Sequence, residues 1–378
     1  MANVLKVIDL FSGCGGSALG FSLAGFSIKV AVDNDPKASE SFKINFPEAR
    51  VFAEDITNLS GKSLLSAGKI RTGKEVLLIA CPPCQGFSNA RRQSERMADP
   101  RNKLIYEFLR LVKEIGPSVF VMENVPGLAT GIGKPLFKDI LEKLHELGYQ
   151  TVYGVVNAAD YGIPQKRKRL ILYGTNRNDI RLTFPLKSYG DPNVSPDLPS
   201  WKTVRDVISD LPKIDSGVKN EKDKMHAAAN LSITNLERIK HTSHNGGSRT
   251  DWPDNLVLDC HKKSNGHKDV YGRMKWDEPS PTITGGCVMI SKGRFGHPDQ
   301  DRAISLREAA RLQTFPDSFQ FSGNTGEIAK QIGNAVPPLL AKKAAMAICD
   351  AMNETNSYKR VTKKRLSGFK NKFLQSFK

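Results

Sequence analysis

The most reactive side-chain type in the sequence occurs twice in the run Cys81-Pro82-Pro83-Cys84, which follows an apolar, β-branched segment at 75–80. Proline fixes its own backbone φ angle, so two prolines hold a neighbouring thiol in one position. Three chemistries fit this spacing. The cysteines can form a thioredoxin-like redox pair, they can supply half of a metal site, or Cys84 alone can act as a nucleophile.

A glycine-rich turn is the second candidate site. The segment Asp9-Leu10-Phe11-Ser12-Gly13-Cys14-Gly15-Gly16 leads from an expected strand into an expected helix. Glycines there let a ligand approach the backbone closely at the carboxyl edge of a parallel sheet. Asp33, 20 residues after Gly13, is placed to bind ribose hydroxyls. The pattern is neither Gly-x-Gly-x-x-Gly nor a P-loop, and the glycines can equally serve tight packing.

Charged side chains follow at later strand ends. Glu123 ends an expected strand and would face the same crevice as the glycine turn, although a strand-end acid can also be merely exposed. In Gln165-Lys166-Arg167-Lys168-Arg169, alternate residues of an extended chain point the same way. Gln165, Arg167 and Arg169 could therefore reach one site together, and the alternative is a solvated charged face.

These residues need a scaffold that brings strand ends together. Short apolar, β-branched runs predict strands at 4–11, 28–33, 50–53, 75–80 and 118–124. Helical patterns lie between them, for example at 17–24, 37–45, 102–115 and 135–147. This alternation predicts a Rossmann-like α/β fold, with a mostly parallel sheet and helices on both faces. Little room for a helix separates 150–157 from 169–174, so we expect an antiparallel hairpin at one edge.

The character of the sequence changes after Thr175. Residues 183–299 are rich in Pro, Gly, Ser and Asn and only weakly periodic, which predicts a smaller, loop-rich domain. Helical patterns return at 305–313 and 337–352. We expect a catalytic domain at 1–182, a second domain at 183–304, a return to the catalytic domain at 305–357 and a basic tail at 358–378.

Composition limits the class of protein. The 378 residues carry a formal net charge of +17, with 39% hydrophobic and 25% charged residues. Such a charge favours a polyanionic partner. The tail from Tyr358 adds to the positive charge, and it either contacts nucleic acid or is a solvated segment. No run is apolar enough to span a membrane and the N-terminus does not read as a signal peptide, so a cytoplasmic protein without a membrane partner is expected.

The six cysteines do not indicate a disulfide framework in a chain of this length. Only Cys81 and Cys84 are close in sequence. The spacing of Cys260, His261, His267 and Cys287 does not suit zinc, so no metal is expected.

Taken in order, these motifs resemble the cytosine carbon-5 DNA methyltransferase family. The resemblance rests on the glycine turn at 9–16, Pro-Pro-Cys-Gln-Gly-Phe-Ser at 82–88, Glu-Asn-Val at 123–125 and Gln-x-Arg-x-Arg at 165–169. Residues 305–317 resemble the family's ninth motif, and Gln-Ile-Gly-Asn-Ala-Val-Pro-Pro at 331–338 resembles its tenth. The motifs keep the family's usual order and cover the chain from Val7 to about Ala345.

The resemblance implies a role for each matching residue. Cys84 would be the covalent nucleophile, and Glu123 would bind N3 and the exocyclic amino group of cytosine. Arg167 and Arg169 would bind the O2 side of the base. The methyl donor S-adenosylmethionine would bind at Phe11, Ser12, Gly13, Gly15, Gly16, Asp33, Asn34, Asp55, Ile56, Pro83, Asn334 and Val336. Cys81 departs from the family, whose members often carry glycine there, and Asn34 stands where some carry an aromatic residue.

The implied reaction is methyl transfer to carbon 5 of a cytosine within a specific sequence of double-stranded DNA. Thiolate addition to carbon 6 would make carbon 5 able to accept a methyl group, and the base must leave the duplex to be reached. The loop-rich domain would select the target. Residues 271–284 resemble the end of the family's target-recognition region, and 241–249 are candidates for base contacts. We expect a monomer, with a restriction endonuclease as functional partner in a restriction–modification system.

Three other functions compete with this one. A thiol–disulfide oxidoreductase built on Cys81 and Cys84 leaves Glu123 and the arginines without a purpose. A DNA-binding protein without catalysis would need a broken catalytic motif, and none is broken. An RNA methyltransferase of the same fold is disfavoured by the long loop-rich region, which suits groove readout.

Overall fold

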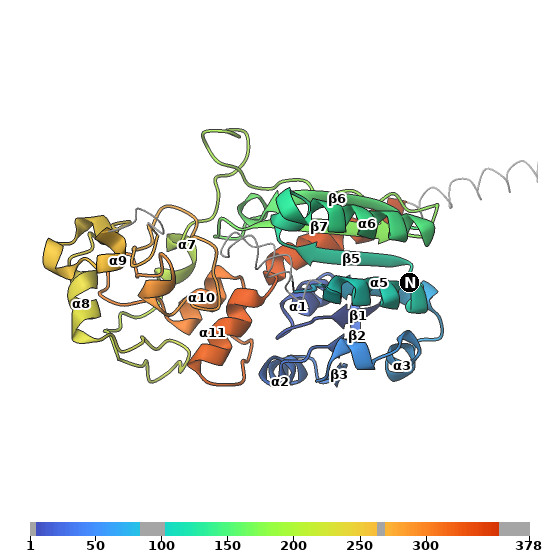
Figure 1. Ribbon diagram of the computed structural model, residues 1–378, viewed down its shortest axis with the longest axis horizontal. Coiled ribbons are helices and arrows are strands. Elements are labelled where there is room, and N and C mark those ends of the chain that lie inside the picture. The colour runs from blue at the N-terminus through green and yellow to red at the C-terminus, as the bar shows by residue number, and fades with distance from the viewer. Residues whose placement is uncertain (1–4, 84–102, 263–268, 355–378) are drawn as a thin grey trace, which may run out of the picture.

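The computed structural model describes residues 5–83, 103–262 and 269–354. Its centre is a seven-stranded sheet with the strand order β3-β2-β1-β4-β5-β7-β6 (Figure 1). The strands are β1 (Lys6–Leu10), β2 (Ser27–Val32), β3 (Arg50–Phe52), β4 (Val76–Ala80), β5 (Val119–Asn124), β6 (Gln150–Asn157) and β7 (Lys168–Thr175). The first five strands are parallel, whereas β7 runs antiparallel to both β5 and β6. The mostly parallel sheet and the antiparallel hairpin at its edge are both confirmed.

Helices cover both faces of the sheet, as the sequence predicted. α3 (Gly61–Ala67), α5 (Leu104–Ile115) and α6 (Lys134–Glu146) pack on one face in a single apolar cluster with the strands. α1 (Gly16–Leu23), α2 (Pro36–Asn45) and a helix at 338–354 pack on the other face. α5 illustrates why these helices pack on the sheet, because its buried side chains recur at three- and four-residue spacing and form one apolar stripe.

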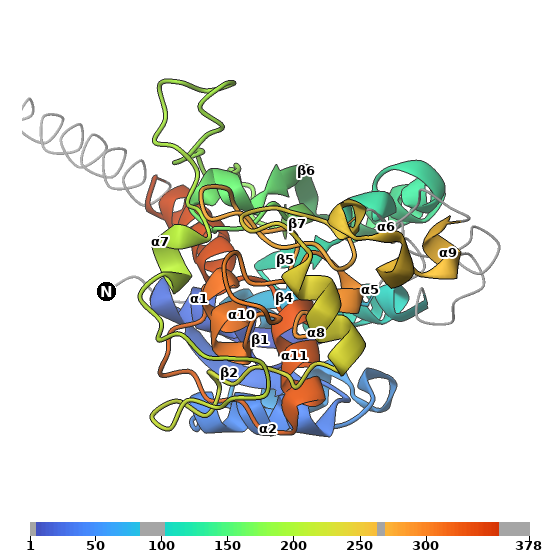
Figure 2. The same cartoon turned by 90° about the vertical axis from the view of Figure 1, so that its left-hand side faces the viewer.

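A second, smaller part of the molecule lies beside the sheet at the left of Figure 1, and Figure 2 shows it in front of the strands. It contains α7 (Arg205–Ile208), α8 (Ile233–Lys240) and α9 (Asp259–Lys262), and α10 (Leu306–Leu312) and α11 (Thr325–Asn334) pack against it. Within 183–262 and 269–304 the described secondary structure is limited to short helices and isolated bridges, in agreement with the loop-rich sequence. α10 and α11 share an apolar cluster with Val204, Met274 and Ile283. The domain limits at 183 and 305 stay predictions.

Buried arginines hold the loops of this part together. Arg273, fully buried, donates hydrogen bonds to the carbonyl oxygens of Thr242, Ile239, His297 and Gln300 and pairs with Asp301. Arg302 forms a bidentate pair with Glu308, with N–O distances of 2.8 and 2.7 Å. Loop carbonyls that no sheet satisfies are thus paired with guanidinium groups, as buried backbone groups require.

Replacing Glu308 by glutamine should lower the free energy of unfolding by about 3–5 kcal/mol, because Arg302 would remain buried without its counter-charge. Burial raises the pKa of Glu308, but the pair with Arg302 outweighs it and the pKa is lowered overall. A carboxyl with a lowered folded-state pKa contributes stability above its unfolded-state pKa and loses it as the pH falls through the folded-state pKa. The wild-type protein should therefore lose this contribution below about pH 4.

Melting temperatures of the wild type and Glu308→Gln, measured from neutral pH down to about pH 3, test this dependence. His297 contributes its own acid sensitivity, because burial lowers its pKa to about 4. His297 lies 3.7 Å from Glu308, whose charge raises the His297 pKa, so the difference between the two proteins reports the titration of Glu308 together with its effect on His297. A difference that stays constant over the whole range would contradict the assignment.

No helix among the described residues is both long and apolar enough to cross a membrane.

Candidate active site

A cavity of about 590 Å³ opens at the carboxyl ends of β1, β2, β4 and β5. Its walls come from the first third of the chain, from Arg167 and Arg169, and from residues 282–336 near its end. The predicted site residues that line it are Phe11, Ser12, Gly13, Gly16, Asp33, Asn34, Asp55, Ile56, Pro83, Glu123, Arg167, Arg169, Asn334 and Val336. Gly15 packs outside the lining, and Cys84 lies outside the described residues.

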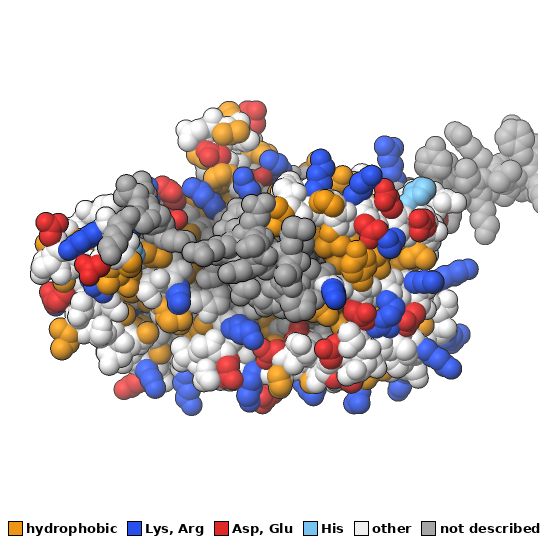
Figure 3. Space-filling view, in the orientation of Figure 1, with side chains coloured by type: hydrophobic (Ala, Val, Ile, Leu, Met, Phe, Trp, Pro, Cys, Tyr) orange, Lys and Arg blue, Asp and Glu red, His pale blue; other side chains and the backbone are white. Residues whose placement is uncertain are grey.

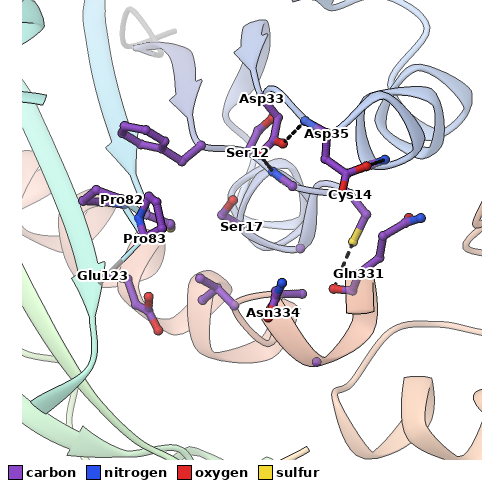
Figure 4. A pocket seen from close by; sticks show the side chains of 18 of the residues that line it. Ser12, Cys14, Ser17, Asp33, Asp35, Pro82, Pro83, Glu123, Gln331 and Asn334 are labelled. Atoms are coloured by element: carbon purple, nitrogen blue, oxygen red, sulfur yellow. Dashed lines mark hydrogen bonds between the residues drawn. The ribbon is translucent and has the colours of Figure 1, made fainter. Parts of the chain in front are cut away.

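Asp33 fastens the glycine turn. Its two carboxylate oxygens accept hydrogen bonds from the backbone N–H groups of Gly13 and Asp35, each at 2.8 Å (Figure 4). Gly13 adopts a left-handed φ of +53°, which suits a residue without Cβ. Burial raises the pKa of Asp33 despite these bonds. The carboxylate keeps free lone pairs beside the cavity, where hydroxyl donors can reach it.

Two more groups shape this end of the cavity. Phe11 has a φ of +56°, which is rare for an aromatic residue and costs about 1–3 kcal/mol. Such strain is common where a side chain must be aimed at a ligand. Asp55, which also lines the cavity, accepts hydrogen bonds from the backbone and hydroxyl of Thr57, which lower its pKa and fix the turn that carries Ile56.

The first and last motifs meet at the cavity wall. A Cβ atom on Gly16 would lie 2.5 Å from the carbonyl oxygen of Val336, and one on Gly333 would lie 2.1 Å from the carbonyl carbon of Thr284. Only glycine permits either approach. Asn334 lies between these contacts and faces the cavity across from Asp33 (Figure 4).

Glu123 and Arg169 form the charged centre of the opposite wall. They extend from the neighbouring antiparallel strands β5 and β7, and their side chains are only 15% and 14% exposed. Arg169 Nε lies 2.8 Å from Glu123 Oε1. The N–H is not aligned for a hydrogen bond, so the contact is an ion pair and this buried oxygen keeps hydrogen-bonding capacity.

Asn124 ties the Pro-Pro segment to this wall. Its side-chain N–H donates to the carbonyl oxygen of Pro82 at 3.0 Å, and its Oδ1 accepts from the N–H of Val125 at 2.8 Å. Asn124 was not predicted as a site residue, although its place in Glu-Asn-Val was a usable signal. It fixes the backbone immediately before Pro83 and Cys84 relative to Glu123.

Arg167 is buried, and its guanidinium donates to the carbonyl oxygens of Ile283, Gly333 and Ala335 at 3.0–3.3 Å. Burial, and then repulsion from Arg169, lower the pKa of Arg167 to about 9. The predicted contact of Arg167 with the O2 side of a base stays a prediction. Gln165 joins the same region by accepting from the N–H of Ile283.

Cys81 lines the cavity below Glu123. Burial, followed by the charges of Glu123 and Asp9, raises the pKa of its thiol well above the usual range. Reactive redox cysteines instead have a lowered pKa. The raised pKa therefore disfavours a redox role for Cys81.

Several further lining residues were not predicted. They include Leu104, Thr282, Thr284, Gly285 and Lys330. Lys330 of α11 forms an ion pair of 2.8 Å with Asp35, which joins two walls of the cavity at its rim. Among the described residues, no group of three or more His, Cys, Asp or Glu side chains is placed to hold a metal ion.

The family model for C-5 cytosine-specific DNA methylases matches residues 5–350. The chain belongs to this family. It is 41% identical to the Type II methylase M.HgiDII of Herpetosiphon aurantiacus over 90% of this chain and 94% of that protein. It is 39% identical to the Type II methyltransferase M1.HphI of Haemophilus parahaemolyticus over 91% of this chain and 86% of that protein.

A solved structure supports the same conclusion for this C-5 cytosine DNA methylase. A prophage-encoded protein of E. coli, described as a DNA modification methyltransferase, superposes with a TM-score of 0.70 at 26% identity. The match covers 92% of this chain and 99% of that chain. The predicted family, the Rossmann-like fold and the enzyme class, DNA (cytosine-5-)-methyltransferase, are confirmed.

Proposed function

We propose that this enzyme transfers a methyl group from S-adenosylmethionine to carbon 5 of a cytosine within a specific sequence of double-stranded DNA. The reaction proceeds through a covalent bond between Cys84 and carbon 6 of a base that has left the duplex. The observation that carries the proposal is the single cavity lined by the Asp33 turn, Pro83 and the Glu123–Arg169 pair. Methyl donor and base would meet between these groups.

The donor end of the cavity fits S-adenosylmethionine. Asp33 is buried beside the glycine turn with free acceptor capacity for ribose hydroxyls. Phe11 offers a strained, directed ring for stacking on adenine, with Asp55 and Ile56 on another part of the wall. When bound, the donor supplies an electrophilic methyl group on a sulfonium.

The other end of the cavity fits cytosine. Addition of the Cys84 thiolate to carbon 6 breaks the C5–C6 double bond and places electron density on the ring. Glu123 would donate a proton or hydrogen bond at N3, and Arg169 would stabilise charge at O2. Pro83 lines the cavity, and Cys84 follows it in the sequence. Asn124 holds Pro82, so the thiol would be delivered from a fixed point.

The methyl-donor site predicts a selective effect of Asp33→Asn. The substitution removes a carboxylate that would accept ribose hydroxyls, and hydrogen bonds to charged groups contribute about 1.5–3 kcal/mol. We expect the dissociation constant of S-adenosylhomocysteine to rise about 10- to 100-fold, measured by calorimetry without DNA. Glu123→Gln is the control that should bind the nucleoside normally. Equal affinities of the wild type and Asp33→Asn would contradict the site.

DNA is proposed as the substrate from charge and family. The chain carries a net charge of +17, and Figure 3 shows Lys and Arg side chains spread over the face that it presents. Neutralising phosphates releases counterions, so binding should weaken steeply with salt.

We propose that residues 183–304 choose the target sequence. We also propose that a cognate restriction endonuclease is the functional partner, since one relative is named a Type II methylase and another a Type II methyltransferase. The protein would act as a monomer.

Methyl transfer from labelled S-adenosylmethionine tests the proposal directly. Duplex DNA and transcribed RNA of matching sequence serve as the two substrates, and the modified nucleosides are identified and mapped. Label on carbon 5 of cytosine at a defined DNA sequence is expected. Label on adenine, on cytosine N4 or only on RNA would refute the proposed reaction.

A further inference from the structure

The carboxyl end of α11 is unusual because distant side chains, rather than a glycine turn, satisfy its terminal carbonyl groups. The last four carbonyl groups of any α-helix lack partners within the helix. α11 ends at Asn334, and the N–H of the next residue, Ala335, returns only to the carbonyl of Gln331. The carbonyl oxygens of Ile332 and Gly333 need donors from elsewhere.

Arg167 supplies one set of donors. Its Nη1 and Nη2 each lie 3.3 Å from the carbonyl oxygen of Gly333, and Nη2 lies 3.1 Å from that of Ala335. Arg167 as a whole is 2% exposed, so water screens these bonds little. A positive charge at a helix carboxyl terminus also interacts favourably with the helix dipole.

Gln313 supplies the other donor. Its Nε2 donates to the carbonyl oxygen of Ile332 at 2.7 Å and to that of Ala335 at 3.3 Å. Gln165, from the same strand-end segment as Arg167, donates to Gln313 Oε1 at 2.8 Å and thereby fixes the orientation of the amide. Arg167 and Gln313 thus converge on the carbonyl of Ala335.

This cap determines where the cavity wall stands. Asn334 lies between the two capped peptide groups, and Val336 follows the second, and both line the cavity. Gly333 is also pressed against the backbone of Thr284 and Gly285, which line the same cavity. This close packing and the cap from Arg167 and Gln313 together position the segment.

We propose that Arg167 and Gln313 are positioning residues for the methyl donor, acting through the end of α11 rather than by touching the base. The inference rests on the proposed function in one respect, namely that the donor binds in this cavity. It gives the two arginines of Gln-x-Arg-x-Arg different tasks. Arg169 acts with Glu123 on the base, whereas Arg167 acts with Gln313 to position the cavity wall at the methyl-donor site.

The test compares Arg167→Met with Arg169→Met, which removes a guanidinium two residues away in the same motif. The dissociation constant of S-adenosylhomocysteine is measured for each protein in the absence of DNA. We expect Arg167→Met to weaken binding at least about tenfold and Arg169→Met to bind within about twofold of the wild type. A residue that only contacts the base has no effect without DNA. Unchanged binding by Arg167→Met would therefore overturn the inference.

Further variants separate positioning from loss of folding. Arg167→Lys keeps the charge but loses the planar fork, so it should bind with intermediate affinity. Gln313→Met leaves Arg167 intact and removes the second donor together with the acceptor of Gln165, so it should also weaken binding of the methyl donor. If Arg167→Met does not fold, Gln313→Met and Arg167→Lys decide the question, and normal binding by both would overturn it.

Steady-state kinetics give an independent readout. Arg167→Lys should raise KM for S-adenosylmethionine while kcat at saturating donor stays near the wild-type value. A lowered kcat with an unchanged KM would instead assign Arg167 to the base and contradict the proposal. Failure of the wild type to bind S-adenosylhomocysteine would refute the proposed function itself, which is a different outcome from equal binding by wild type and variant.

Discussion

Cys84→Ser should abolish methyl transfer, with a rate at least about a thousandfold below the wild type, which corresponds to about 4 kcal/mol of lost transition-state stabilisation. A serine hydroxyl is far less acidic than a thiol, so the attacking anion is not available at neutral pH. Without the covalent bond to carbon 6, carbon 5 of cytosine is too weak a nucleophile to take the methyl group. Labelled methyl transfer to duplex DNA, measured at equal protein concentrations, gives the rates.

Cys81→Ser is the matched control, three residues away in the same segment. The thiol of Cys81 has a raised pKa, which disfavours its thiolate form. Cys81→Ser should therefore retain methyl transfer within about tenfold, the allowance covering a polar hydroxyl placed in a buried position. Equal losses in the two variants would contradict the assignment of Cys84 as the sole nucleophile and would revive the redox pair.

A duplex carrying 5-fluorocytosine at the mapped site makes the covalent step visible. After methyl transfer, carbon 5 holds fluorine in place of the proton that must leave before Cys84 is eliminated, so the adduct persists. The wild type and Cys81→Ser should form a DNA–protein adduct that survives denaturation. Cys84→Ser should form none.

Glu123→Gln is expected to lower kcat by about 10²- to 10⁴-fold, the range for losing a positioned acid or base. Glutamine occupies nearly the same volume and can still form a hydrogen bond, but it cannot give a proton to N3. Binding of DNA and of S-adenosylhomocysteine should be almost unchanged, because Glu123 belongs to the base end of the cavity. Single-turnover methyl transfer separates the chemical step from product release.

The ion pair with Arg169 complicates that measurement, because Glu123→Gln leaves a guanidinium only 14% exposed without its counter-charge. Arg169→Met and the double variant complete a cycle that isolates the coupling between the two residues. If Glu123 acts on N3, the double variant should be no faster than Glu123→Gln. Recovery of activity in the double variant would show that the loss came from an unpaired Arg169 and not from missing proton transfer.

The sheet was predictable because its strands carry their signal locally. β4, for example, is a continuous apolar run that is buried along its whole length, as a central parallel strand must be. α3 was not predicted, because it is seven residues long and begins with glycine. Its capping box uses Ser60 and Ser63 rather than the more recognisable serine and glutamate.

Only the site residues that belong to recognisable local motifs could be predicted from the sequence. Asp33 follows β2, Glu123 lies at the end of β5, and Arg169 lies at the start of the antiparallel β7, so their meeting at one edge follows from the topology. The partners of Arg167 lie 116–168 residues away in the sequence, and they are backbone carbonyls that any residue could present. No local pattern encodes that arrangement, so the contacts of Arg167 with the end of α11 could not be predicted from the sequence.

The helix at 338–354 has a consequence for how the nascent chain matures. It packs on the same sheet face as α1, so closely that a Cβ on Gly20 would lie 2.4 Å from the carbonyl oxygen of Pro338. At roughly 5–20 residues per second of synthesis, that apolar face stays uncovered for on the order of tens of seconds. The growing polypeptide should therefore engage holdase chaperones, and it should gain a complete methyl-donor cavity only when the segment through Val336 has joined the fold.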